Sequence, residues 1–348
     1  MKLAATLFTT VLGGAADYSS NGDNWTGTCQ TGQRQSPIHI DETGNDIITK
    51  TTFQDFKVEN YDTPMKWKVI NKATTIQLEP NAGSPEMKLT GGYLGSEYKL
   101  LQIHFHWDVN ANGLPVGPQG SEHTVTRKGQ TAITPYRGEV HFVHGKVGAD
   151  LSDLSTAAGD DLAVLGFFLD VDDSLPKSWF DYTLDDLIDV NVQDTASPPT
   201  AEIEIDWTAS SMLPKELDGF WRYEGSLTTP TCNEIVRWTV FETPLTMKQA
   251  SWDNLVKSVG LAADNTSPHV PSNYRNVQPL NDRKISYYKK SNVVAPSSSK
   301  KKFGTKVAFG TLPMSYKDPL TGQMSTKLQQ VQKVLLCFGE DEKLCMFM

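Results

Sequence analysis

The hydrophobic and polar residues between positions 17 and 288 form short alternating or apolar runs, which Gly, Pro, Asn and Asp residues separate. Runs of this kind predict β-strands joined by turns. Helical periodicity is scarce, and Thr246–Val259 is the best helical candidate. The pattern therefore predicts a mainly β protein with a few short helices. We expect strands at Met65–Ile70, Lys99–Trp107, Glu139–Val143, Leu162–Val171 and Ile235–Phe241.

The amino-acid composition of the chain changes after Tyr288. Residues 289–302 are rich in Lys and Ser, which is typical of a solvated linker. Beyond this linker, five apolar residues fit one face of a helix, namely Leu328, Val331, Val334, Leu335 and Phe338. We therefore divide the chain into a folded domain at 17–288 and a linker with a C-terminal extension of unknown role at 289–348.

The N-terminus has the layout of a secretory signal peptide. Lys2 is followed by the mostly apolar run Leu3–Leu12 and by four small residues at 13–16. We expect residues 1–16 to be removed on export, so that the protein is secreted or resides in another extracytoplasmic compartment. The alternative is a buried N-terminal strand. The apolar run is too short to span a bilayer, and no later segment is long enough to predict a transmembrane helix.

The net charge of −9 gives the chain no electrostatic means of holding nucleic acid, because phosphate binding needs clustered Lys and Arg. Four cysteines are present, at 29, 232, 337 and 345, and export would favour their pairing. Four cysteines allow three connectivities, and their spacing alone does not choose among them. Asn24 and Asn265 begin Asn-x-Ser/Thr triplets, which accept glycans only in a eukaryotic secretory route.

Four of the seven histidines fall in two tight groups, Gln102–Trp107 (QIHFHW) and Glu139–His144 (EVHFVH). Successive side chains of a strand point to opposite faces, so His104 and His106 share one face about 7 Å apart. His141 completes a site of three nitrogens if the two strands are neighbours. Zinc prefers such imidazole ligands, and a catalytic zinc site leaves its fourth position open.

Polar residues accompany these histidines on the same strand faces. Gln102 and Glu139 each lie two positions from a candidate ligand, on the face that this ligand occupies. Metal-binding histidines need such partners to fix their tautomer and orientation.

These motifs resemble those of the alpha-class carbonic anhydrases. The resemblance rests on the two histidine groups, on Gly120–Val125 (GSEHTV) and on Gly225–Pro230 (GSLTTP), and it covers roughly 17–288. It implies a single domain around a large twisted, mostly antiparallel β-sheet, with Zn²⁺ as the cofactor. It also implies reversible hydration of carbon dioxide to bicarbonate and a proton. Four shorter matches flank these motifs, at Gln35–Ile38, Leu162–Gly166, Met212–Asp218 and Gln278–Leu280.

The resemblance implies a role for each matching residue. His104, His106 and His141 are the zinc ligands, and Gln102, Glu139 and the backbone carbonyl of Asn273 are their partners. Thr228 and Glu122 orient the reacting water. An ionised carboxylate only accepts hydrogen bonds, so Thr228 must donate to Glu122 and accept from that water. Cys29 and Cys232 match a linking pair of exported members. The residues that match the carbon dioxide pocket are Val143, Val164, Leu227, Thr229, Val236 and Trp238.

The proton route departs from the best-known pattern of the family. Fast members carry a histidine shuttle in the cleft, and the matching position here is Thr74. Its neighbours Lys72, Ala73 and Thr75 are not expected to shuttle protons near pH 7 either. Tyr18 matches a cleft tyrosine that orders the water network. The resemblance therefore predicts that protons leave through water directly to buffer.

Two other functions compete with this interpretation. A non-catalytic carbonic-anhydrase-like binding or matrix module usually lacks a zinc ligand, whereas all three are present here. A structural zinc site would close its fourth position with Cys or His, and the motifs offer no such residue nearby.

Overall fold

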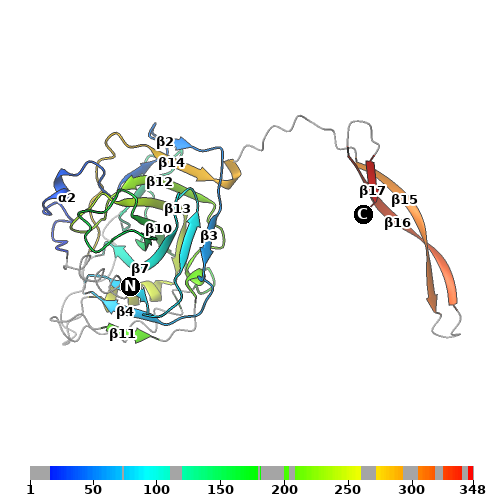
Figure 1. The fold of residues 1–348 in the computed structure, drawn as a ribbon, viewed down its shortest axis with the longest axis horizontal. Helices are drawn as coiled ribbons and strands as arrows, with labels where there is room; N and C mark the ends of the chain where they lie inside the picture. The colour runs from blue at the N-terminus through cyan, green and yellow to red at the C-terminus, as the bar shows by residue number, and fades with distance from the viewer. Residues whose placement is uncertain are drawn as a thin grey trace. The chain divides into compact units, whose positions relative to one another are not determined.

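A computed structural model describes residues 16–72, 74–109, 120–178, 181, 200–203, 208–259, 272–292, 305–317, 324–338 and 344–347. Its centre is one twisted sheet of 12 strands (Figure 1). Ten strands follow one path across this sheet. In order they are β11 (Thr200–Ile203), β4 (Trp67–Asn71), β5 (Ile76–Pro80), β7 (Tyr98–Trp107), β9 (Gly138–Lys146), β10 (Leu162–Val171), β13 (Val236–Met247), β12 (Gly219–Gly225), β14 (Ile285–Lys289) and β2 (Ile47–Thr49).

Strands β3 (Phe56–Glu59) and β6 (Lys88–Gly91) extend the sheet beside β7. Only β10–β13 and β14–β2 are parallel pairs within it. A separate parallel pair joins β1 (His39–Asp41) to β8 (Thr124–Thr126). The described helices are short: α2 (Thr28–Thr31), α4 (Gln249–Ser258), η1 (Ala209–Met212) and η2 (Lys290–Asn292). The mainly β class with a large, mostly antiparallel sheet is confirmed.

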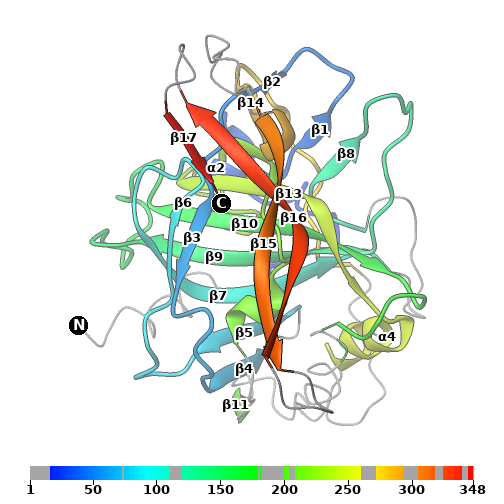
Figure 2. The same cartoon turned by 90° about the vertical axis from the view of Figure 1, so that its right-hand side faces the viewer.

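The five expected strands all form, as β4, β7, β9, β10 and β13. Four of them are neighbours in the middle of the sheet, where Figure 2 shows β13, β10, β9 and β7 side by side, whereas β4 lies next to the edge strand β11. The helical candidate Thr246–Val259 is confirmed only from Gln249 onward, because its first residues continue β13 to Met247.

Alternating side chains of the central strands supply two apolar clusters, one on each face of the sheet. Ile103, Phe105 and Trp107 of β7 join the larger cluster, which also takes in Trp252 of α4. Val143 of β9, Val164 of β10 and Trp238 of β13 belong to the second cluster. Because β7 alternates, His104 and His106 emerge on the face opposite the larger cluster. The core thus fixes which way the histidines point.

The residues after Val293 form a separate compact unit. Its described part is an antiparallel sheet of β15 (Thr305–Lys317), β16 (Met324–Phe338) and β17 (Leu344–Phe347). The helical face expected at Leu328–Phe338 is therefore wrong. Short apolar runs fit a helix or a strand almost equally well, and β16 forms ladders with a strand on each side.

Two sequence features, the proposed signal peptide and the Asn-x-Ser/Thr triplet at Asn265, lie wholly or almost wholly outside the described residues. Among the described residues, no helix is long and apolar enough to cross a membrane. The domain boundary at 288/289 stays a prediction.

Candidate metal centre

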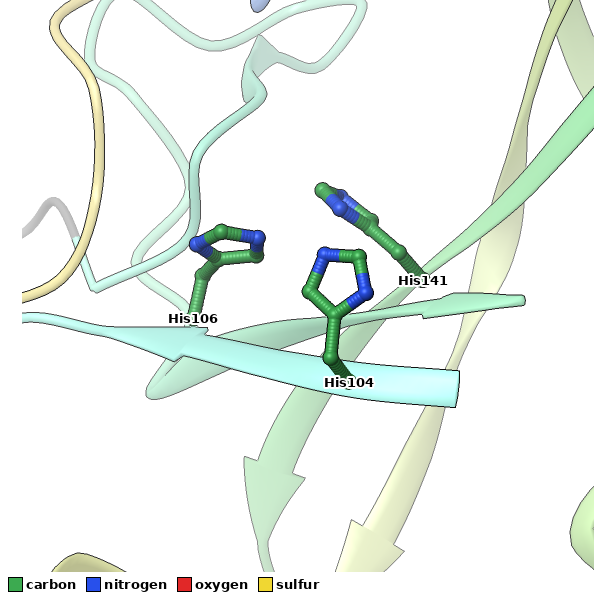
Figure 3. Close-up of side chains that lie close together, drawn as sticks. All are labelled: His104, His106 and His141. Atoms are coloured by element: carbon green, nitrogen blue, oxygen red, sulfur yellow. The ribbon is translucent and has the colours of Figure 1, made fainter. Parts of the chain in front are cut away.

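Three histidine rings converge on the face of the sheet opposite the larger core cluster. His104 and His106 come from β7, and His141 comes from the neighbouring strand β9, where its Cα is paired with that of His104. Figure 3 shows the rings turned toward one another. Each ring offers a nitrogen, and these nitrogens all lie within 4.8 Å of one another. The antiparallel register therefore brings His141 to His104, from which it is 37 residues distant in the sequence, and to His106.

One nitrogen of each ring forms a hydrogen bond to an acceptor in the protein, which fixes the orientation of the ring. His104 Nδ1 lies 2.7 Å from Gln102 Oε1, and His106 Nδ1 lies 2.7 Å from the carbonyl oxygen of Asn273. His141 Nε2 lies 2.8 Å from Glu139 Oε1. These oxygens only accept, so the imidazoles donate and their other nitrogens carry a lone pair. The nitrogens left for a ligand are thus Nε2 of His104 and His106 and Nδ1 of His141.

Burial keeps the three imidazoles neutral. It lowers the pKa of His104 and His141, and it lowers the pKa of His106 to about 3. Burial alone would raise the pKa of Glu139, but the facing His123 and His141 hold it below the usual range. The site therefore combines neutral imidazoles with an ionised carboxylate behind them, which suits metal ligation.

The donor set fits a zinc ion. Zinc takes imidazole nitrogens and leaves one position open when the site is catalytic. Nε2 of His106 is buried and has no hydrogen-bond partner among the residues that the structure describes, so a bound ion would compensate this polar atom. A second group, His123, Glu139 and His141, is also compact enough to hold a metal. Its members already hydrogen-bond to one another, so we assign the metal to the first group.

Glu122 lies beside the histidines and is fully buried. Its Oε1 accepts a hydrogen bond of 2.9 Å from the backbone N–H of Arg275. Burial raises the pKa of Glu122, whereas a hydrogen bond from the Thr228 side chain lowers it. Burial is the larger effect, so the pKa of Glu122 lies well above its usual range. Thr228 thus lies near the Glu122 carboxyl, as the sequence motifs led us to expect, while Oε2 of Glu122 has no hydrogen-bond partner among the described residues.

A cleft opens beside the rings, and both polar and apolar residues line it. Gln77, Gln102, His104, His141, Thr228 and Thr229 line it, together with Val143, Val164, Leu227 and Trp238. Five of the six expected pocket residues are in this lining. Val236 is instead fully buried in the apolar cluster behind the wall.

Asn273 does more than the sequence motifs indicated. Besides its carbonyl bond to His106, its Oδ1 accepts from the N–H of Trp107 at 2.6 Å. Its Nδ2 donates to the carbonyl oxygens of Thr74 at 2.7 Å and Phe105 at 2.9 Å. One buried side chain thus ties β7 to the turn that carries Thr74.

Neither of the two residues expected in the cleft water network, Thr74 and Tyr18, is among the residues that line the cleft. Thr74 is partly buried. Tyr18 packs its ring edge-on against Trp25, with the centroids 5.5 Å apart. Burial raises the pKa of Tyr18, and the nearby charge of Glu122 raises it further.

The disulfide between Cys29 and Cys232 is present, with the Cα atoms 5.0 Å apart across 203 positions of sequence. The N–H of Cys232 donates to the carbonyl oxygen of Thr229 at 2.8 Å, so the bond braces the turn next to the cleft. In the C-terminal unit, Cys337 and Cys345 are opposite each other in the β16–β17 register.

Sequence reasoning missed Arg275. Its guanidinium is buried and donates to Gln35 Oε1, to the carbonyl oxygen of Ser36 and to that of Cys29 at 2.7–2.9 Å. This side chain joins the N-terminal segment to the backbone that holds Glu122. Its position two residues after Asn273 was the available signal.

Comparison of the sequence with known protein families identifies the family of this chain. The family model of eukaryotic-type carbonic anhydrases matches residues 20–289. The chain belongs to the eukaryotic-type carbonic anhydrase family.

Several curated relatives share this match. A Caenorhabditis elegans protein named "Putative carbonic anhydrase 3" is 35% identical over 255 residues, which cover 73% of this chain and 90% of the relative. Carbonic anhydrase 4 of Rattus norvegicus is 28% identical over 274 residues, covering 77% and 79%. Carbonic anhydrase 7 of Mus musculus is 29% identical over 256 residues, covering 73% and 88%.

Proposed function

We propose that this protein catalyses the zinc-dependent, reversible hydration of carbon dioxide to bicarbonate and a proton. The observation that carries this proposal is the convergence of three neutral imidazoles, each fixed by its own acceptor, beside a half-apolar cleft. Zinc bound there supplies a water that is acidic enough to react near neutral pH, a property for which carbonic anhydrase is the standard example.

The chain's own residues orient this water. In this proposal the Glu122 carboxyl reacts as the carboxylate and accepts from the Thr228 hydroxyl, which gives the hydroxyl one fixed direction. The charge of Arg275 and its N–H act in favour of this ionised form, against the burial that raises the pKa of Glu122. The Thr228 oxygen is then free to accept from the reacting water. The N–H of Arg275 helps to keep Glu122 in place and stabilises its charge. A reacting lone pair is thereby directed to one side of the cleft.

Carbon dioxide itself needs little more than an apolar surface next to this water. Val143, Val164, Leu227 and Trp238 provide that surface. A small apolar molecule gains from leaving water for such a wall, while the product bicarbonate is charged and gains from returning to solvent. The wall therefore favours binding of the substrate over retention of the product.

A non-catalytic module of the same family is the main alternative. Three ligand histidines, the Thr228–Glu122 pair and the apolar wall support the enzyme instead. We also propose that the protein functions in the secretory pathway or outside the cell. The Cys29–Cys232 disulfide supports this location, because such bonds persist in oxidising compartments.

The decisive experiment measures zinc content and carbon dioxide hydration in the same preparation. We expect about one zinc per chain, the number that a single three-histidine site holds, and stopped-flow hydration that a chelator abolishes and zinc restores. His104→Ala, His106→Ala and His141→Ala should each lose zinc and nearly all activity. His39→Ala is the matched control, since His39 lies on β1 and outside the cleft lining. Full activity in a zinc-free variant would refute the proposal.

A further inference from the structure

Next to the candidate metal centre, one residue of the cleft lining belongs to a chain of three hydrogen-bonded polar side chains. Gln77 of β5 lines the cleft, and its Cα is paired with that of His104. Lys72, in the turn before β5, donates from Nζ to Gln77 Oε1 at 3.3 Å. Gln77 Nε2 donates in turn to Glu79 Oε1 at 2.5 Å. All three residues belong to the β4–β5 hairpin.

The carboxylate fixes the direction of this chain. An ionised carboxyl group only accepts hydrogen bonds, so the amide of Gln77 must turn its NH₂ group toward Glu79. Its oxygen then faces Lys72 and can accept one of the amine's N–H bonds. Gln77 is almost fully buried, which leaves its amide few alternative partners. The amine of Lys72 is thus held against Gln77, which itself lines the cleft.

From this geometry we propose that Lys72 is the group that accepts the proton leaving the cleft, with Gln77 and Glu79 as its positioning residues. The inference rests on the proposed carbon dioxide hydration. In each turnover a cleft water loses a proton: an O–H bond breaks, and an N–H bond forms on the neutral amine of Lys72. The resulting ammonium then returns its proton to solvent or buffer. Lys72 is partly exposed, so it has access to both sides of this transfer.

The electrostatic surroundings support such a role. Burial lowers the pKa of Lys72, and Glu79 only partly offsets this effect. Burial raises the pKa of Glu79 against the hydrogen bond from Gln77 and the charges of Lys68 and Lys72. The pKa of Lys72 and the pKa of Glu79 are thereby both shifted in the direction of neutral pH. Proton transfer is most efficient when the pKa of the accepting group lies near the working pH.

This inference revises an expectation from the sequence. An ordinary surface lysine holds its proton too tightly to act near pH 7. The side chain of Lys72 is instead packed in a partly buried position against Gln77. The sequence motifs gave Thr74, two residues further on, as the shuttle position, and Lys72 was not expected to shuttle protons near pH 7.

Lys72→Met tests the proposal, with Lys68→Met as the matched control. Lys68 also lies beside Glu79 on the same hairpin, and no described hydrogen bond joins it to Gln77. In weak buffer, Lys72→Met should lower kcat about tenfold while kcat/KM stays unchanged, because only the proton step is affected. Imidazole buffer should restore the lost turnover. Gln77→Leu should show the same pattern more weakly, and Lys68→Met should match the parent protein.

The possible outcomes separate this inference from the proposed function. A parent protein without hydration activity would contradict the function itself. An active parent whose kcat is unchanged by Lys72→Met at every buffer concentration would overturn the assignment of Lys72. A parallel fall of kcat and kcat/KM, with no rescue by imidazole, would also overturn it, since Lys72 would then act on the chemical step or on the shape of the cleft.

Discussion

His104 and His141 are paired Cα to Cα across β7 and β9, and their ring centroids lie 5.1 Å apart. This relationship makes the metal centre depend on strand register. A slip of one residue would send His141 to the opposite face of the sheet, into the larger apolar cluster. Val140 and Phe142 already occupy that face and are fully buried there. The packing of the core therefore selects the register that assembles the site.

Removal of the Cys29–Cys232 bond should destabilise the protein strongly. The bond closes a loop across 203 positions, for which the chain-entropy model gives about 5 kcal/mol. We expect Cys29→Ser/Cys232→Ser to unfold at a much lower denaturant concentration than the parent protein. Both should unfold at the same concentration once a reductant is present. An unchanged midpoint under oxidising conditions would contradict a stabilising role.

Acid should weaken the zinc-free protein partly through Glu139. His123 and His141 hold the pKa of this carboxyl below its unfolded value, although burial opposes them. Its contribution to stability is therefore complete above the unfolded pKa of about 4.5, and it is lost as the pH falls further toward the folded pKa. Denaturant unfolding across this range should show that the stability difference between the parent and Glu139→Gln shrinks in acid.

Glu59→Gln serves as the control for this experiment, because Glu59 is exposed on β3. Its stability difference from the parent should show no such decline. A pH-independent difference for Glu139→Gln would mean that the carboxyl is not held below its ordinary pKa.

The parts of the fold and site that follow from local patterns were predictable from the sequence. Alternation on β7 and β9 gave the faces of His104, His106 and Glu139, and the structure places all three as expected. Motif order supplied the Cys29–Cys232 pair, which no local pattern could choose.

The remaining features depend on tertiary contacts. The side-chain amide of Asn273 forms hydrogen bonds to segments about 170 to 200 residues away in the sequence. Patterns within a short stretch of sequence could not predict these contacts. Burial of Lys72 likewise arises from the packing of the β4–β5 turn. In the C-terminal unit, pairing of β16 with two strands outweighs the weak helical periodicity of its apolar residues.

We predict that the C-terminal unit is dispensable for catalysis. The family match ends at residue 289, and the residues after Val293 form a compact unit of their own. A chain ending at residue 289 should retain zinc and the parent's kcat/KM. A chain ending at residue 293 is the control, because it keeps the Lys290 contacts with Asp218 and Asp55. Loss of activity in both folded, zinc-loaded chains would show that the unit takes part in catalysis.

The last prediction concerns the position that matches the histidine shuttle. Thr74 has a hydroxyl that does not titrate near pH 7, whereas an imidazole does. Turnover of the parent at saturating carbon dioxide should therefore rise with buffer concentration, and imidazole-type buffers should raise it most. Thr74→His should increase kcat in weak buffer and leave kcat/KM nearly unchanged, since the chemical step is untouched.

Combining this change with Lys72→Met makes the test sharper. If Lys72 accepts the proton in the parent, Thr74→His should restore in the double variant most of the turnover that Lys72→Met removes. The carbonyl of Thr74 is held by Asn273, so this turn offers a fixed backbone from which a new imidazole can act. Stopped-flow hydration of the four proteins over a series of buffer concentrations measures the effect. Fast parent turnover that is independent of buffer and unchanged by Lys72→Met would show that another group, neither Thr74 nor Lys72, already carries the proton out of the cleft.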